Sequence, residues 1–352
     1  MFSQRLTTLT PYTPGEQPQD RSYIKLNTNE NPYPPSPRVT QYLNALDGEA
    51  LRRYPDPKFT ALRERIAARY GVSRGQVFAG NGSDEVLSFV FFAFFDSAAA
   101  GPLRFPEHSY SFYPVYCNYY GIAATRIPLA ADYRIDLAPY LQGASCGVIF
   151  PNPNAPTGIA LPLTDIASFM SQYPSDRVVV LDEAYVDFGA ESAVSLIDRH
   201  PNLLVVRTLS KSMSLAGLRL GFAMGDPRLI DALYTTKDAF NSYPLGTLSQ
   251  QVGALAMDDP DYYDRITRAI IDTRERFSAD LNALGWDVLP SAANFVFARR
   301  PGVSGNTVYR QLKKNGILVR HFDTPGIADF VRITIGTDAD MAACTAAMTE
   351  EF

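Results

Sequence analysis

The residues best suited to chemistry are an acid, a phenol, an amine and a guanidinium in the middle of the chain. Asp182 and Tyr185 lie in the run VVVLDEAYVDF, and Lys211 and Arg219 follow in the run TLSKSMSLAGLRLG. An amine forms a Schiff base with a carbonyl, a carboxylate pairs with a protonated ring nitrogen, and a guanidinium binds phosphate. The four groups predict a site for a carbonyl-bearing, phosphorylated pyridine, and hence carbon–nitrogen chemistry on amines.

Each of these motifs is weak when taken alone. A strand that ends in Asp-Glu also occurs in ATPases, but the chain contains no GxxxxGK[ST] motif. A lysine in a Ser/Thr-rich loop is more often solvated than catalytic. Here Arg219 follows the small residues Ala216 and Gly217, and Ser210 adds a hydroxyl beside Lys211. The combination therefore favours a phosphate-binding loop.

A second glycine-containing motif, GNGSDEV, covers residues 80–86 and leads into an apolar run. Such a turn presents unpaired N–H groups and the positive end of a helix dipole to an anion. It is equally typical of a capped helix start, with Ser83 or Asp84 as the N-cap residue. Tyr110, in HSYSFYP, offers a flat face for stacking on a ring or is an ordinary core aromatic.

The composition is that of an ordinary globular enzyme. A chain of 352 residues with 46% hydrophobic residues buries a large core and usually divides into two domains. The net charge of −5 gives no basic surface for nucleic acid or anionic lipid. The apolar run Val86 to Phe95 is too short to cross a bilayer, and we expect a buried helix there. With no secretion signal at the start of the sequence, the cytoplasm is the expected compartment.

The cysteines and histidines predict neither a metal site nor a disulfide framework. They show no CxxC or HxxxH spacing and are scattered along the chain. We expect the thiols to be buried: Cys117, Cys146 and Cys344.

Apolar runs that alternate with amphipathic stretches predict an α/β fold, with a mostly parallel sheet covered by helices on both faces. Seven strands are expected, at Gln76–Ala79, Pro102–Phe105, Ala123–Ile127, Cys146–Phe150, Arg177–Leu181, Leu203–Arg207 and Leu220–Met224. Between them we expect helices at Phe59–Tyr70, Ser83–Phe95 and Leu163–Tyr173. Asp182 and Tyr185 would then lie at the carboxyl end of a central strand, where open α/β sheets build their sites.

The sequence changes character after Pro260, where a smaller α+β domain is expected. Its elements are a long amphipathic helix and then a shorter series, at Asp261–Leu284, Trp286–Leu289, Asn294–Ala298, Thr307–Lys314 and Phe330–Ile335. The first forty residues are rich in Pro, Asn and Tyr and predict an extended arm. We therefore expect an arm and part of the small domain at 1–45, a large cofactor-binding domain at 46–259 and a small domain at 260–352.

The motifs resemble those of the fold-type I, class I/II aminotransferases that depend on pyridoxal phosphate. The resemblance covers essentially the whole chain through GNGSDE, PNAPTG, LDEAY, TLSKSMSLAGLRLG and VRITIGT. Two further motifs, KLNTNENPYPPSP at 25–37 and RRYPDP at 52–57, resemble the branch that acts on histidinol phosphate rather than aspartate-type relatives. This implies a large domain with a sandwiched, mostly parallel sheet and a smaller α+β domain.

The resemblance also implies roles for single residues. Lys211 would be the Schiff-base lysine and proton shuttle, Asp182 would pair with the pyridine nitrogen, and Tyr185 would bind the ring oxygen. Tyr110 would stack on the ring, and Tyr54 would reach the phosphate of a partner subunit in a homodimer. The phosphate would be held by residues of the two loops, Gly82, Ser83, Ser210 and Arg219, and Asp84 is expected to be a further cofactor-binding residue.

One position departs from the family pattern, which places an asparagine before Pro-Thr-Gly. Ala155 stands there in this chain, and Asn154 is expected to take over the bond to the cofactor. For the substrate, the resemblance implies that Arg320 and Arg332 bind the anionic end and that Tyr12 and Asn29 cover it. A side-chain pocket is expected from residues 240–243.

Together these features predict a cytoplasmic, homodimeric aminotransferase with a ping-pong mechanism and amine and keto-acid substrates. Histidinol phosphate with 2-oxoglutarate is the preferred pair. Three alternatives stay open: an aromatic amino-acid aminotransferase, a phosphothreonine decarboxylase, and a cofactor-sensing regulatory domain. A nicotinamide dehydrogenase is disfavoured because no strand leads into GxGxxG with a downstream acid.

Overall fold

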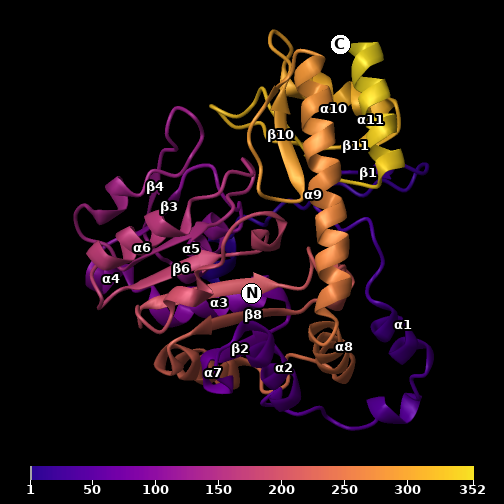
Figure 1. The fold of residues 1–352 in the computed structure, drawn as a ribbon. Helices are drawn as coiled ribbons and strands as arrows, with labels where there is room; N and C mark the ends of the chain where they lie inside the picture. The colour runs from indigo at the N-terminus through magenta and orange to yellow at the C-terminus, as the bar shows by residue number, and fades with distance from the viewer. Residues whose placement is uncertain (1) are drawn as a thin grey trace.

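The computed structural model describes residues 2–352, and its centre is a seven-stranded sheet (Figure 1). The strands lie in the order β2-β8-β7-β6-β5-β3-β4. Only β8 is antiparallel to its neighbours, so the predicted mostly parallel sheet is confirmed. The strands are β2 (Val77–Gly80), β3 (Leu103–Pro106), β4 (Ala124–Ile127), β5 (Gly147–Pro151), β6 (Val178–Asp182), β7 (Leu203–Thr208) and β8 (Gly221–Gly225).

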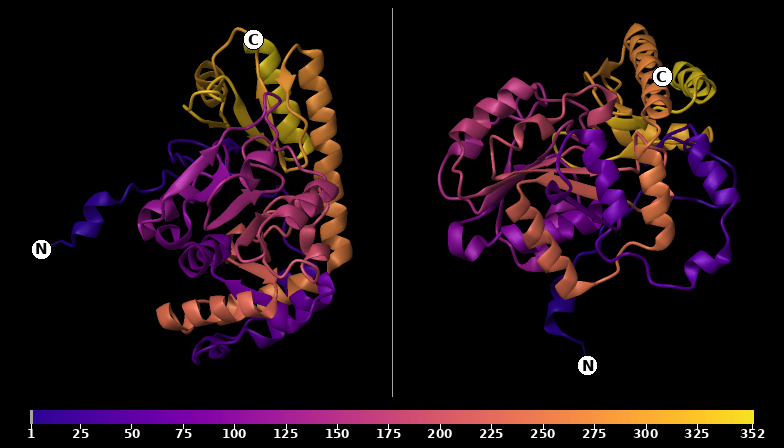
Figure 2. Two further views of the ribbon diagram at one scale, coloured as in Figure 1. Left: turned by 90° about the vertical axis from the view of Figure 1, so that its left-hand side faces the viewer. Right: turned by 60° about the horizontal axis from the view of Figure 1, so that its bottom comes forward.

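Helices cover both faces of this sheet (Figure 2). Its central strands are buried on both faces, which explains why their sequences are continuous apolar runs such as VVVL. The α-helices before α9 are α1 (Pro37–Asn44), α2 (Thr60–Tyr70), α3 (Gly82–Phe94), α4 (Ser97–Ala100), α5 (Tyr113–Tyr120), α6 (Leu163–Gln172), α7 (Pro227–Phe240) and α8 (Thr247–Met257), and the 3-10 turns among them include η2 (Gly48–Leu51) and η5 (Val186–Phe188).

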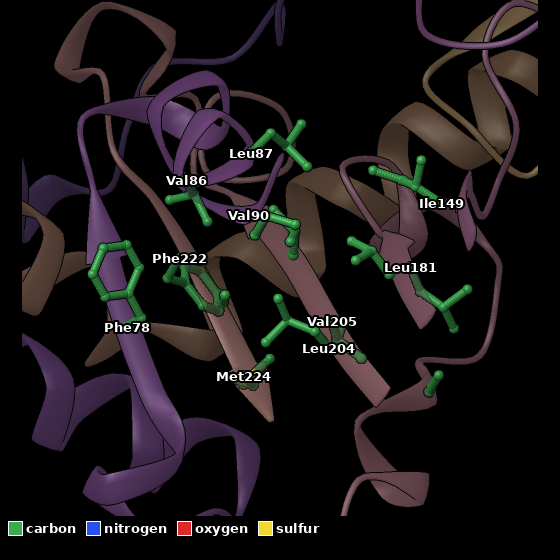
Figure 3. Close-up of a cluster of buried hydrophobic side chains, with 14 of the residues drawn as sticks. Phe78, Val86, Leu87, Val90, Ile149, Leu181, Leu204, Val205, Phe222 and Met224 are labelled. Atoms are coloured by element: carbon green, nitrogen blue, oxygen red, sulfur yellow. The ribbon is translucent and has the colours of Figure 1, made fainter. Parts of the chain in front are cut away.

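Helix α3 carries the GNGSDEV motif and packs on the sheet. Figure 3 shows Val86, Leu87 and Val90 over the side chains of β7 and β8. The prediction that the whole run from 86 to 95 is buried was wrong at one position, because Phe92 is 65% exposed. The three residues before Phe92 are buried, whereas Phe92 lies on the outer face of the helix, as a 3.6-residue period requires.

A second, smaller part of the chain is built on a four-stranded antiparallel sheet, in the order β12-β13-β10-β9. Helix α9 (Pro260–Ala283) joins it to the rest: Ile266 packs in the large core and Ile270 in a separate core around Trp286. The remaining elements are β9 (Asp287–Val288), β10 (Phe295–Arg299), α10 (Gly305–Lys314), β11 (Ile317–Leu318), β12 (Arg320–His321), β13 (Val331–Thr334) and α11 (Asp338–Glu351).

The N-terminal arm crosses from one part of the molecule to the other. Its 3-10 turn η1 (Gln4–Thr8) projects from the body in both views of Figure 2. Farther along, β1 (Ile24–Lys25) pairs in parallel with β11. The arm is therefore anchored beside the C-terminal elements before residues 27–31 pass over the end of the large sheet, where Asn31 donates to the Lys211 carbonyl.

Candidate active site

The carboxyl ends of β6 and β7 bring the predicted acid and amine to one place. Asp182 is the last residue of β6; its carboxylate accepts from the Tyr113 hydroxyl at 2.9 Å and from the Ala184 N–H at 3.2 Å. Burial raises the pKa of Asp182 to about 6. Among the described residues this buried carboxylate has two neutral donors and forms no ion pair, so it is suited to pair with a protonated ring nitrogen.

Lys211 follows β7 and lies between the large sheet and the N-terminal arm. Its Nζ donates to the Thr28 carbonyl at 3.1 Å and lies 5.7 Å from the centre of the Tyr185 ring. The Tyr185 hydroxyl in turn accepts from the Asn29 side chain at 2.9 Å. The arm therefore supplies partners for both the predicted amine and the predicted phenol.

The two predicted phosphate loops meet at the start of α3. A Cβ on Gly82, which has a φ of +81°, would lie 2.5 Å from the Arg219 guanidinium, and a Cβ on Gly221 would lie 2.3 Å from the Ser83 nitrogen. Both positions therefore require glycine. Asn81, and not Ser83 or Asp84, is the N-cap residue of α3. Within residues 2–352, no side chain forms a capping hydrogen bond at this helix start. Its first N–H groups thus face the loop of Arg219.

Asp84 holds two other predicted residues in place. Its carboxylate accepts from the Tyr110 hydroxyl at 2.6 Å and from Arg219 at 3.0 Å. Burial and the Asp84 charge raise the pKa of Tyr110 well above its usual value, so the phenol stays neutral. Asp84 was predicted to contact the cofactor, whereas its contacts here make it the partner of Tyr110 and Arg219.

Two adjoining cavities lie between these residues. One, of about 120 Å³, is lined by the predicted cofactor residues Ser83, Asp84, Tyr110, Asp182, Tyr185, Ser210, Lys211 and Arg219. The other, of about 170 Å³, is lined by the predicted substrate residues Tyr12, Asn29, Arg320 and Arg332. Lys211, Tyr185 and Tyr110 line both, so the amine stands where the cavities meet.

The second cavity has a cationic wall built around one aromatic ring. The guanidiniums of Arg320 and Arg332 both lie 5.5 Å from the centre of the Phe322 ring. Burial lowers the pKa of Arg332, and the nearby Arg320 charge lowers it further. Among the described residues, the buried Nε of Arg332 has no hydrogen-bond partner. The wall is thus suited to an anion that would satisfy both cations.

Two sequence-based predictions do not fit the geometry of the described chain, and Tyr54, predicted to serve a partner's site, stays a prediction. Asn154 lines neither cavity there: its Nδ2 donates to the His108 carbonyl and to Thr157, and Ala155 lines both cavities instead. The side-chain pocket expected from residues 240–243 is not formed within residues 2–352 either. Phe240 is exposed, and Tyr243 stacks on Tyr54 at 4.8 Å. Tyr54 itself is 83% exposed and lines neither cavity of the described chain.

Some residues of the site were missed by sequence reasoning. Tyr113, which bonds Asp182, lies in the same HSYSFYP run as Tyr110 but was not singled out. Asn31 donates to the carbonyl oxygens of Lys211 and Ser212, and Thr28 accepts from Lys211. The NTNEN run in the arm was the available signal, because polar side chains in an otherwise aperiodic segment need partners.

The residues present fit a phosphorylated pyridine. The buried Asp182 carboxylate lacks a cation, two glycines leave space at a helix N-terminus, and Arg219 and Ser210 line the same cavity. Asp182 would hold the ring nitrogen, and Ser83, Ser210 and Arg219 would hold the phosphate.

Comparison with known proteins agrees with this chemistry. The family model described as aminotransferase class I and II matches residues 21–347. A protein of Syntrophus aciditrophicus named histidinol-phosphate aminotransferase is 57% identical, covering 97% of this chain and 95% of its own. One of Bordetella parapertussis, named histidinol-phosphate aminotransferase 1, is 56% identical and covers 100% of this chain and 98% of its own.

A solved structure of a protein with the same name has a similar fold. The histidinol-phosphate aminotransferase of Sinorhizobium meliloti, in complex with pyridoxal-5'-phosphate, has a TM-score of 0.87 and 25% identity. The match covers 99% of this chain and 96% of that one. This chain therefore belongs to the class I and II aminotransferase family, whose members are transferases that depend on pyridoxal phosphate.

Proposed function

We propose that this enzyme transfers the amino group of histidinol phosphate to 2-oxoglutarate, a step of histidine biosynthesis. The observation that carries the substrate assignment is the pair of guanidiniums, Arg320 and Arg332, in a cavity that opens onto Lys211. A phosphate dianion on one substrate and a carboxylate on the other suit the same two cations. Relatives at 57% and 56% identity bear the name of this activity.

When bound, the cofactor supplies a carbonyl that carries the amino group and a ring that withdraws electrons. Lys211 then accepts and returns the substrate's α-proton at Nζ, and the Thr28 carbonyl orients that atom. Asp182 keeps the ring nitrogen protonated because a cation there relieves the cost of its own burial. Tyr110, held by Asp84, limits movement of the ring on one face.

The arginine pair predicts a strong dependence on the substrate's phosphate. Within residues 2–352, Arg320 donates to the arm carbonyls of Thr13 and Pro14, at 3.3 Å each, and Arg332 donates to the Asn27 carbonyl at 3.2 Å. A dianion would replace or complete these long contacts with charge-assisted bonds. Free histidinol, which lacks the phosphate, would leave both guanidiniums in a cavity without a counter-ion.

The test is Arg332→Ala in steady-state transamination. We expect kcat/KM for histidinol phosphate to fall roughly 10- to 100-fold, because a charge-assisted contact contributes about 1.5–3 kcal/mol. Arg299→Ala serves as the matched control, since Arg299 lies on the adjacent strand β10 and pairs with Asp287 on the surface. It should leave kcat/KM within about twofold of the wild type, as surface substitutions usually do.

The rank order of donors decides between substrates. Histidinol phosphate should exceed histidinol, phenylalanine and tyrosine in kcat/KM, with 2-oxoglutarate as acceptor. A higher value for phenylalanine or tyrosine would make the enzyme an aromatic aminotransferase. Release of carbon dioxide from phosphothreonine at a comparable rate would make it a decarboxylase.

We further propose a homodimer in which Tyr54 completes the partner's phosphate site. The support is an exposed aromatic side chain on a firmly held backbone. Buried Lys237 donates to the Pro57 and Ser242 carbonyls at 3.3 and 3.1 Å, and Gln250 donates to the Asp56 and Leu245 carbonyls at 3.0 Å each. The two side chains fasten the loop of Tyr54 to the loop of Tyr243. A second copy would cover the aromatic side chains that this leaves exposed.

Two further assignments are part of the proposal. The free thiols of Cys117, Cys146 and Cys344 suit a reducing compartment, so we place the enzyme in the cytoplasm. We also propose that residues 46–259 form the cofactor-binding domain and that 260–352, with part of the arm 1–45, form a smaller one. The two separate hydrophobic cores, both contacted by α9, support that division.

A further inference from the structure

An ionic network that joins the buried Arg207 to the partly exposed Asp187 lies directly behind the Lys211 loop. Arg207, on β7, is 4% exposed and forms an ion pair with Asp187, on η5 two residues after Tyr185. The other carboxylate oxygen of Asp187 accepts from the Ser212 hydroxyl at 2.5 Å. Ser212 is the residue next to Lys211. One carboxylate therefore joins the segment that carries Tyr185 to the segment that carries the amine.

The rest of the network keeps Asp187 ionised. The Arg207 guanidinium lies 4.7 Å from the centre of the Tyr70 ring and 3.7 Å from Glu183. Partial burial acts against the charge on Asp187, but Arg207 and the Ser212 hydroxyl outweigh it and lower the pKa of Asp187. Burial raises the pKa of Glu183 to about 7, although Arg207 opposes the shift, and Glu183 accepts from Ser192 and the Ala193 N–H. The full positive charge of Arg207 is thus directed mainly at Asp187.

The Lys211 loop is held from two sides. The Asn31 side chain of the arm donates to the Lys211 and Ser212 carbonyls at 3.0 and 3.3 Å, and Asp187 holds the Ser212 hydroxyl from behind. We propose that Asp187 is a positioning residue that acts through Ser212 to fix the direction of the Lys211 side chain. This inference rests on the proposed role of Lys211.

A purely structural role would not need the link to Ser212. The Arg207–Asp187 pair and the Glu183 contacts already satisfy the buried charges, and the Ser212 bond adds only one hydrogen bond to that cluster. The particular consequence of the Ser212 bond is geometric, because this bond fixes the backbone next to the Lys211 amine. A shift of about 1 Å in a reacting group is enough to slow a reaction about 100-fold, whereas the loss of one charge-assisted hydrogen bond lowers stability without by itself slowing the reaction.

The chain offers a matched pair for the test. Ser212→Ala removes the link, and Ser214→Ala removes a buried hydroxyl from the same loop that has no hydrogen-bond partner among the described residues. Ser212→Thr restores a hydroxyl. The first readout is the rate at which the apoenzyme attaches pyridoxal phosphate to Lys211, followed by absorbance and trapped with borohydride. The second is kcat and KM measured separately, with the melting temperature as a control.

We expect Ser212→Ala to slow attachment and to lower kcat about tenfold, with KM within twofold and a melting temperature lowered by no more than about a few degrees. Ser214→Ala should match the wild type, and Ser212→Thr should recover most of the loss. Asp187→Asn should reproduce the Ser212→Ala defect if it folds. Attachment and kcat of Ser212→Ala equal to those of Ser214→Ala would overturn the inference. Borohydride labelling of the wild type at a residue other than Lys211 would instead refute the proposed function.

Discussion

At the carboxyl ends of β6 and β7 the candidate residues are buried and have partners within the chain, whereas the Tyr54 segment, residues 52–57, presents its aromatic side chain to solvent. Asp182 is bonded by Tyr113 and Ala184, and Lys211 by Thr28. Tyr54 stacks only on Tyr243, although its backbone neighbours are held by Lys237 and Gln250. A fixed backbone with an exposed side chain is typical of a preformed contact surface. The comparison separates what one chain supplies from what we propose that a second chain completes.

The largest expected effect is at the strand ends, with Lys211→Ala. Because one side chain is both covalent anchor and general base, transamination should fall by about 10³-fold or more. Cofactor should still bind weakly through the loops of Ser83 and Arg219. Borohydride labelling of the wild type followed by peptide mapping checks the position. Label on Lys25 would contradict the account, since Lys25 is paired with Glu30 on the arm.

At the same strand ends, Asp182→Asn should lower the activity but raise the stability of the apoenzyme. It removes the charge that holds the ring nitrogen protonated, so kcat should fall about 10²-fold, as is typical when a preorganised electrostatic group is lost. It should also stabilise the apoenzyme at pH 7.5, because the wild type must bury an ionised carboxylate there.

The pH dependence of that stability follows from the raised pKa of Asp182, about 6 against a usual 3.8. Since the folded state binds the proton more tightly, this group favours folding below pH 4, and that contribution is lost as the pH rises to 6. The difference of about two units corresponds to at most roughly 3 kcal/mol. Urea unfolding at pH 7.5 should favour Asp182→Asn, and near pH 4 the two proteins should converge. Equal stability at pH 7.5 would contradict the account.

The strand-end region could be largely predicted from sequence. Continuous β-branched runs identify buried strands, parallel strands put their carboxyl ends at one edge, and the positions of Asp182 and Lys211 follow from that. Arg219 instead precedes β8, which is antiparallel to its neighbours. Element bounds shifted by one or two residues because side-chain patterns do not mark where backbone pairing stops. The position of Asn154 could not be read from the sequence, because the loop places Ala155, and not its neighbour, against both cavities.

The Tyr54 segment, and the side chains that hold the strand-end residues in place, could not be predicted in the same way. Tyr113, Asn31 and Asp187 act across long sequence separations, and no local pattern shows which polar side chains will meet. Lys237 sits in an amphipathic helix where a solvated lysine is the usual case, yet it is fully buried with two carbonyl partners. The exposure of Tyr54 likewise depends on tertiary packing, although its motif indicated an interface.

The most direct test of the shared active site combines one variant from each of the two regions. Tyr54→Phe and Lys211→Ala chains are combined, dissociated and reassembled, so that half of the dimers are hybrids. If Tyr54 serves the partner's site, one site of each hybrid has both wild-type residues, and activity should recover to about a quarter of the wild type, above either parent. If proven hybrids show no more than half of the Tyr54→Phe activity, Tyr54 acts in its own subunit and the shared site is wrong.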